Sequence, residues 1–301
     1  MSARNGELQM ISVEREAYFS SEGIKRNRSR EYRRSGTLRK KRRRKRRLRQ
    51  LAFCMFGIFL VAVIGICFVT NWFTKIPPTS TAMQKAEIKD IEEMAKSENY
   101  PEELLELLEQ NEETGDFVKN YSNRAEYQGK EIDLSGDFEA GSVPLLMQWD
   151  KRWGYDFYGD SMIGLAGCGP TCMTMAYLYY TGDTTMNPRK MAEFAQNSGY
   201  HTQEGTSWDF WTGGAAELGL SGEMISLNES AMKSVLDTGG LLVCSMSPGD
   251  FTTKGHFILI RGYDEHGFFV NDPNRKGNSE KQWDFKTLSP QIKNLWGIYT
   301  L

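Results

Sequence analysis

Residues with catalytic or metal-binding side chains are scarce in this sequence. The 301-residue chain has only three histidines and five cysteines. Five cysteines are too few for a disulfide-dense mini-protein, and no group of His and Cys has the spacing of a zinc site. We therefore expect no metal and no cofactor. The 40% hydrophobic and 25% charged residues exclude a collagen-like and a fully disordered chain.

One stretch of the chain has no charge at all. No charged residue lies between Leu51 and Thr74, and the apolar run Leu51–Phe73 ends in Trp72 and Phe73. A bilayer core takes about 20 apolar residues in a helix, and aromatic side chains favour its interface. We predict a transmembrane helix at 51–73, rather than a buried core helix or a cleaved signal peptide, which has a shorter apolar run.

The charge is divided unequally between the two sides of this run. Residues 1–50 contain 18 Lys and Arg against 5 Asp and Glu, whereas the rest is acidic, and the formal net charge of -2 hides this division. The positive-inside rule keeps the basic side in the cytoplasm. We expect a single-pass type II protein of the cell membrane, with its C-terminal domain outside the cytoplasm. The basic flank would contact anionic lipid headgroups and, lacking interleaved aromatic residues, no nucleic acid.

The composition divides the chain into five parts. Residues 1–50 are the basic segment, expected to be disordered, and 51–73 are the transmembrane helix. Residues 74–97 form a linker or stalk, 98–142 a helical extension and 143–301 a globular domain.

Regular structure is predicted from residue 82 onward. The predicted helices are 82–97, 101–111, 168–180, 188–198, 208–218 and 229–236, and the predicted strands are 241–245, 256–263, 268–271 and 295–299. Because the helices of the globular domain precede its strands, the pattern indicates an α+β domain with an antiparallel sheet.

Cys168 is the candidate nucleophile. Three cysteines, Cys168, Cys172 and Cys244, lie beyond the membrane segment, and an odd number leaves at least one thiol unpaired. Cys168 precedes Gly169-Pro170 at the expected start of an apolar helix, where exposed backbone N–H groups favour a thiolate. A disulfide between Cys168 and Cys172, or simple burial, is the alternative.

A thiol nucleophile needs a base, usually histidine. His266 lies in a predicted hairpin turn and His201 in a polar loop, whereas His256 opens an apolar strand. With the turn where we expect it, Asp272 is a diagonal neighbour of His256 across the hairpin and could orient its ring. A loop one residue shorter would put Asn271 there instead.

Four segments in order resemble the C39-like branch of the papain-fold cysteine peptidases. They are Val143–Gly154, Gly167–Thr171, Gly255–Phe257 and Val270–Asn274, and Gly205–Trp208 is similar to this branch as well. The resemblance covers about residues 143–301, and the segment from Tyr100 through Val118 is similar to the extension found ahead of such domains. It implies a papain-like fold, in which N-terminal helices and a central buried helix are followed by an antiparallel sheet.

The resemblance also implies roles for individual residues. Cys168 would be the nucleophile, His256 the general base and acid, and Asp272 the residue that orients the imidazole. Gln148 and the backbone N–H of Cys168 would be the donors to the oxyanion, because a carboxamide is a suitable neutral donor. Gln148 lies 20 residues before Cys168, and a capping or packing role is the alternative.

These inferences predict a membrane-anchored, extracytoplasmic bacterial cysteine peptidase that forms a thioester intermediate. Its partners would be the membrane and a peptide substrate. Two alternatives stay open: an amidase or endopeptidase acting on peptidoglycan stem peptides, and a catalytically silent papain-like module that binds peptides at the cell surface. Leader-peptide processing, as in transporter-fused relatives, is not expected, because this chain has the opposite predicted topology and no P-loop motif.

Overall fold

The computed structural model describes residues 81–301. The basic segment and the apolar run predicted to span the membrane lie outside the described residues. Among residues 81–301, no helix combines the length and the apolar character needed to cross a bilayer. Residues 82–301 form one compact unit.

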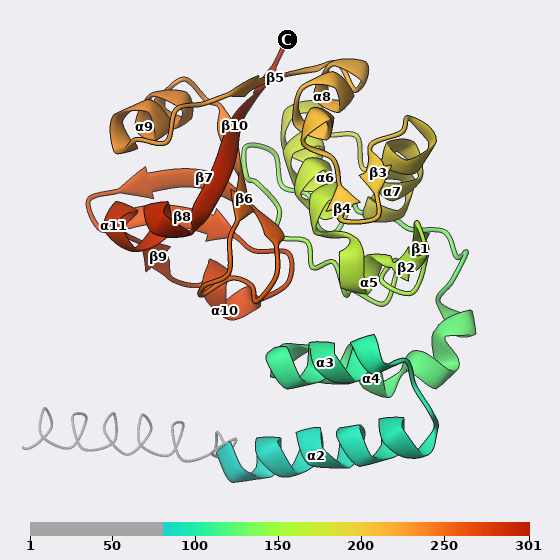
Figure 1. Ribbon diagram of the computed structural model, residues 1–301. Coiled ribbons are helices and arrows are strands. Elements are labelled where there is room, and N and C mark those ends of the chain that lie inside the picture. The colour runs from blue at the N-terminus through green and yellow to red at the C-terminus, as the bar shows by residue number, and fades with distance from the viewer. Residues whose placement is uncertain (1–80) are drawn as a thin grey trace, which may run out of the picture. The chain divides into compact units, whose positions relative to one another are not determined.

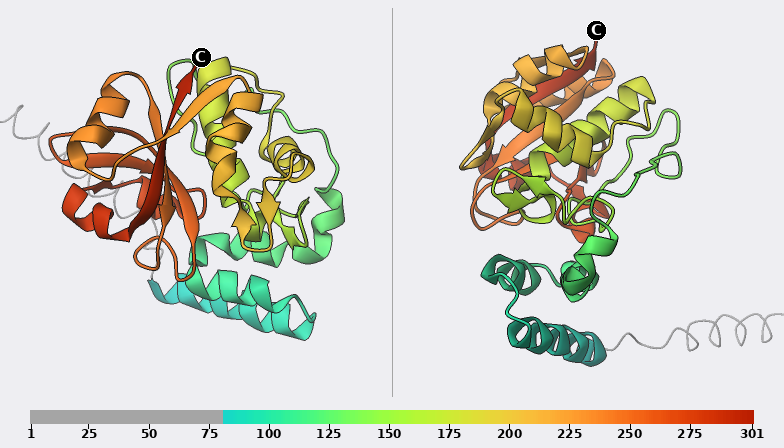
Figure 2. Two further views of the ribbon diagram at one scale, coloured as in Figure 1. Left: turned by 45° about the horizontal axis from the view of Figure 1, so that its top comes forward. Right: turned by 90° about the vertical axis from the view of Figure 1, so that its right-hand side faces the viewer.

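Two helices at the start of this unit lie side by side (Figures 1 and 2). They are α2 (Thr81–Ser97) and α3 (Glu102–Gln110), and three short helices follow them: η1 (Glu112–Thr114), α4 (Gly115–Lys119) and η2 (Tyr121–Glu126). Their apolar side chains form one buried cluster with Tyr155 and Met162 of the next region. The predicted helical extension therefore shares a core with the domain that follows it.

The domain contains one long buried helix, α6, and several shorter ones. They are α5 (Ile163–Ala166), α6 (Cys168–Thr181), α7 (Pro188–Asn197), η3 (Trp208–Trp211), α8 (Gly213–Glu217) and α9 (Glu229–Asp237). Most residues of α6 are buried because its sequence is apolar on nearly every side. It ends at Gly182, whose φ of 66° is a left-handed conformation that glycine adopts without strain.

One six-stranded antiparallel sheet forms the other half of the domain, in the order β5-β10-β6-β7-β8-β9. Its strands are β5 (Leu220–Met224), β6 (Leu241–Met246), β7 (His256–Asp264), β8 (Gly267–Asn271), β9 (Gln282–Trp283) and β10 (Ile292–Thr300). One face packs on α6 and the opposite face on α9 (Figure 1). The fold is thus a mixture of helices and an antiparallel sheet, as predicted.

Short elements complete the domain. The hairpins β1–β2 (Phe157–Tyr158, Ser161–Met162) and β3–β4 (His201–Thr202, Gly205–Thr206) contact each other through Tyr158, and α10 (Lys276–Ser279), α11 (Phe285–Leu288) and η4 (Ser289–Gln291) connect the last strands.

One predicted helix is wrong, and strand β5 was not predicted. The single helix predicted at 208–218 is instead a 3-10 turn, η3, and a short helix, α8, which are separated at Thr212. Strand β5, which was not predicted, precedes α9 and pairs with β10, so the order of helices before strands is only approximate. The β5 sequence has no β-branched or aromatic residue, and it contains Gly222, where a Cβ would collide with the carbonyl oxygen of Trp211.

The β7–β8 hairpin contains a bulge that decides which residue accompanies His256. Near the turn, Gly262 pairs with Phe269, whereas beyond Arg261 the pairs are Ile260–Val270 and Leu259–Asn271. Arg261 is thus one extra residue in β7. Because side chains alternate between the two faces, this shift puts Asp272, rather than Asn271, on the face of His256.

Candidate active site

Cys168 is the first residue of α6 and is half-buried. Pro170 fits the first turn because that turn needs no N–H from it. At Gly169, an added Cβ would lie 2.3 Å from Oγ1 of Thr206, so no larger residue fits there without displacing Thr206. The Cys-Gly-Pro sequence therefore places the thiol where the helix begins, as predicted.

The other described cysteines differ from Cys168. Cys172 and Cys244 are fully buried, and no disulfide joins any of the three, so the alternative of a Cys168–Cys172 bridge is not realised. The Cys172 thiol donates to the carbonyl oxygen of Phe257 at 3.4 Å. Burial raises the pKa of both Cys172 and Cys244. Among these three thiols, only Cys168 is accessible.

His256 and Asp272 form a buried hydrogen-bonded pair. His256 Nε2 lies 2.7 Å from Asp272 Oδ1, and the two side chains are 6% and 0% exposed. Burial alone would lower the pKa of His256, but the Asp272 charge, the hydrogen bond and the neighbouring Cys168 raise it above its ordinary value. Burial opposes the ionisation of Asp272 as well, and His256 and other donors keep its pKa below the ordinary value. The arrangement stabilises an imidazolium next to a carboxylate.

Asp272 is held by donors from the residues that follow it. Its Oδ1 accepts from the backbone N–H groups of Asn274 at 2.8 Å and Arg275 at 3.3 Å. Its Oδ2 accepts from Asn278 Nδ2 at 2.7 Å, and its own N–H donates to Ser279 Oγ at 2.8 Å. Asn278 and Ser279 were not predicted, because only the turn of α10 brings these two polar residues back to the carboxylate.

Asn271, the alternative partner of His256, is engaged elsewhere. Its Nδ2 donates to the carbonyl oxygen of Pro144 at 2.9 Å, and its Oδ1 accepts from Arg261 Nε at 2.9 Å. Arg261 is the bulge residue of β7, so the bulge both shifts the register and supplies a partner for Asn271.

Gln148 is buried beside Cys168 in space despite the distance between them in sequence. The intervening residues fold back through β1–β2 and α5. Gln148 Nε2 donates to the carbonyl oxygen of Gly164 at 3.0 Å and lies 3.4 Å from that of Leu165, while Oε1 has no partner. The backbone N–H of Gln148 donates to the carbonyl oxygen of Pro273 at 2.8 Å, so Gln148 is bonded to the loop after Asp272.

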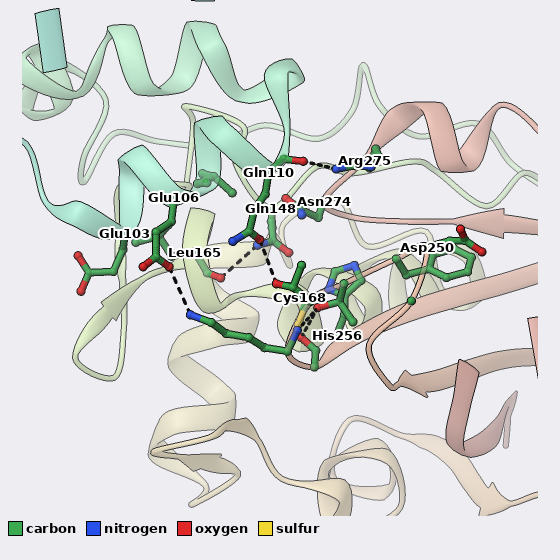
Figure 3. A pocket seen from close by; sticks show the side chains of 17 residues that line it. Glu103, Glu106, Gln110, Gln148, Leu165, Cys168, Asp250, His256, Asn274 and Arg275 are labelled. Atoms are coloured by element: carbon green, nitrogen blue, oxygen red, sulfur yellow. Dashed lines mark hydrogen bonds and ion pairs between the residues drawn. The ribbon is translucent and has the colours of Figure 1, made fainter. Parts of the chain in front are cut away.

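Gln148, Cys168 and His256 line one cavity of about 400 Å³ (Figure 3). Helix α3 of the extension borders it on one side, and the loop of residues 249–255 borders it as well. Lys254 Nζ lies 3.3 Å from Glu106 Oε2, and Thr253 Oγ1 lies 3.3 Å from Gln110 Oε1, so exposed polar contacts join the loop to α3. Asp272 does not line the cavity and lies behind His256.

The other two histidines, and the aromatic residues near Trp208, lie outside this cavity. His266 is exposed in its turn, and His201 packs edge-on against Tyr158. Phe210 and Trp211 are core residues, whereas Trp208 is 41% exposed. In the described part of the chain, no group of three or more His, Cys, Asp or Glu is arranged to hold a metal ion.

Comparison with known proteins places the domain in a family. Residues 141–300 match the Peptidase_C39 like family. Among solved structures, the peptidase domain of Streptococcus ComA, a bi-functional ABC transporter of a quorum sensing pathway, is 14% identical, with 45% of this chain and 93% of that chain covered and a TM-score of 0.36. A C39-like peptidase from Bacillus anthracis is 14% identical, with 54% and 96% covered and a TM-score of 0.35. No curated protein matches the chain. Because the family match spans more than half of the sequence, this chain belongs to the Peptidase_C39 like family.

Proposed function

We propose that the protein is a cysteine peptidase that hydrolyses peptide bonds through Cys168, His256 and Asp272. One observation carries the proposal: an accessible thiol lines the same cavity as an imidazole that is hydrogen-bonded at 2.7 Å to a buried carboxylate. A nucleophile, a base and a third group that orients the base are the components of covalent acyl transfer.

In the proposed reaction, the Cys168 thiolate attacks the carbonyl carbon of the scissile peptide bond. The C–N bond then breaks as the His256 imidazolium gives its proton to the leaving amine, and a thioester remains on Cys168. Water attacks this thioester while His256 accepts the water's proton. The C–S bond breaks, the peptide acid leaves and the thiolate is restored. Asp272 keeps the imidazole oriented in both steps.

The oxyanion of each tetrahedral intermediate would be stabilised by Gln148 and the Cys168 backbone N–H. Gln148 Nε2 carries two hydrogens, and one of them is used in the 3.0 Å contact with Gly164. The second hydrogen makes a long, weak bond of 3.4 Å to the carbonyl oxygen of Leu165, and it would have to leave that bond to reach an acceptor in the cavity.

Replacing Gln148 with alanine is expected to lower kcat by about 10²-fold and to leave KM nearly unchanged, because an oxyanion donor acts only in the transition state. Steady-state kinetics of the purified full chain would measure both constants. Gln110→Ala is the matched control, since Gln110 lines the same cavity, and it should retain the wild-type kcat. An unchanged kcat in Gln148→Ala would mean that Gln148 is not an oxyanion donor and has only a packing role.

We further propose the papain-like form of this fold and a single-pass anchor at residues 51–73. The apolar run and its basic flank support the anchor, with the basic residues next to anionic lipid headgroups and the peptidase domain outside the cytoplasm. On that side of the membrane, the substrates would be extracytoplasmic peptides or the peptides of the cell wall.

Incubating the full chain, solubilised in a mild detergent, with fluorogenic peptide libraries tests the proposed activity. We expect hydrolysis that stops when iodoacetamide alkylates Cys168. Mass spectrometry of purified muropeptides incubated in parallel would reveal cleavage of stem peptides, the first alternative. If neither class is cleaved and Cys168→Ser still binds peptides as the wild type does, the protein is a binding module and the peptidase proposal is wrong.

A further inference from the structure

The helical extension forms hydrogen bonds with the segment that follows Asp272. Residues 274–277 make hydrogen bonds to Gln110, Asn111 and Glu113, which lie where α3 ends and η1 begins. All three lie outside residues 141–300, which match the peptidase family. The family domain alone therefore does not contain the contacts described here.

Glu113 makes the most specific of these contacts. Its carboxylate accepts from two successive backbone N–H groups, Lys276 to Oε2 at 2.6 Å and Gly277 to Oε1 at 3.0 Å. These amides begin α10, a helix of only four residues that cannot be stable in isolation. Bonds to a carboxylate are charge-assisted and stronger than those between neutral groups, although water reaches these two because Glu113 is exposed.

The neighbouring residues fix the chain just before α10. Asn111 is buried, and its Nδ2 donates to the carbonyl oxygen of Asn274 at 2.5 Å, where Trp149 Nε1 also donates at 2.7 Å. The Arg275 guanidinium donates to the carbonyl oxygen of Gln110. The extension therefore holds both the start of α10 and the turn that leads into it.

Helix α10 in turn holds Asp272. Asn278 and Ser279 are its last two residues, and they bind Oδ2 and the backbone N–H of Asp272 at 2.7 and 2.8 Å. Hydrogen bonds thus join the Glu113 carboxylate to the start of α10, the end of α10 to Asp272, and Asp272 to His256, and the backbone of α10 connects the first two.

We propose that Glu113 is a positioning residue of the active site, which acts through α10 to hold the Asp272 carboxylate against His256. The proposal rests on the proposed function of Cys168, His256 and Asp272. It assigns the extension a part in catalysis, because the residues that bind Asp272 belong to a segment that the extension holds.

Alkylation of Cys168 by iodoacetamide tests this role without a known substrate. In Glu113→Ala, Asp272 is held less firmly and stabilises the His256 imidazolium less. The Cys168 thiolate, which forms together with that imidazolium, is then less populated near neutral pH. We expect the alkylation rate of Cys168, followed by mass spectrometry of its peptide in the full chain, to fall by about 10-fold at pH 7. At about pH 10 a free thiol ionises unaided, and the rates should converge.

Matched variants separate positioning from general damage. Glu112→Ala removes the neighbouring carboxylate, which is exposed as that of Glu113 is, and should behave as the wild type. Asn278→Ala should reproduce the effect of Glu113→Ala, and the double variant should be no slower than the slower single variant, because both residues act on the same carboxylate. Asp272→Asn should be slowed at least as much.

The outcomes distinguish this inference from the proposed function. A wild-type rate in Glu113→Ala, together with a slowed Asp272→Asn, would overturn the positioning role and leave the peptidase proposal intact. Additive losses in the double variant would also overturn it. If Asp272→Asn itself alkylates as fast as the wild type, the proposed catalytic arrangement is wrong, and the positioning role falls with it.

Discussion

Cys168→Ala is expected to reduce kcat/KM by about 10⁴-fold or more, to the background of the assay. The substitution removes the atom that forms the thioester, and removing the nucleophile of a comparable triad costs about as much as removing the whole triad. Hydrolysis of fluorogenic peptides by the full chain would measure the loss. Labelling by a thiol-reactive peptide electrophile should disappear in the same variant, because the remaining described thiols are buried.

Cys172→Ser is the matched control for this experiment. Cys172 lies one helical turn after Cys168, and its thiol donates to Phe257, a bond that a serine hydroxyl can replace. The variant should keep most of its activity and its labelling. Retained hydrolysis in Cys168→Ala would contradict the assignment of the nucleophile. Labelling that is lost only in Cys172→Ser would show that Cys172, and not Cys168, is the reactive thiol.

The fold could be predicted best where local signals are strong. Helix α6 begins and ends where Cys-Gly-Pro and Gly182 predict, because helix starts and glycine caps depend on adjacent residues. Strand β5 could not be predicted, since Leu220–Met224 forms a strand only by pairing with β10, some 70 residues later in the chain. A strand whose stability comes from a distant partner leaves little trace in its own composition.

In the site, too, some residues could be predicted from local sequence signals and others depend on distant parts of the chain. Gln148, Cys168 and His256 could be singled out by residue type and motif, and the structure brings them to one cavity. The choice between Asp272 and Asn271 depended on a bulge at Arg261, which a sequence pattern does not specify. The contacts of Glu113 with α10 span more than 160 residues, so nothing near either segment could have indicated them.

Asp272→Asn is expected to lower kcat by between about 10² and 10⁴-fold while preserving the fold. The amide has nearly the shape of the carboxylate, but it cannot stabilise the imidazolium and it favours the wrong ring tautomer. Without the Asp272 charge, the effect of burial is the larger one, and it lowers the pKa of His256. The alkaline limb of the rate profile should therefore move to lower pH, which rate measurements across the pH range would detect. Asp264→Asn, at the far end of the same hairpin, should leave both kcat and the profile unchanged.

The same substitution makes an independent prediction about stability. The pKa of His256 is raised in the folded protein, so its contribution is complete below the ordinary value of about 6.5 and is lost as pH rises through the folded value. The pKa of Asp272 is lowered, so its contribution is present above about 3.9 and is lost as pH falls through the folded value. The stability of the wild type relative to Asp272→Asn should thus be largest between about pH 4 and 6.5 and shrink on both sides. Denaturant unfolding of both proteins at several pH values would measure the difference in their free energies of unfolding. A difference that does not vary with pH would mean that the pair is not ionised in the folded protein.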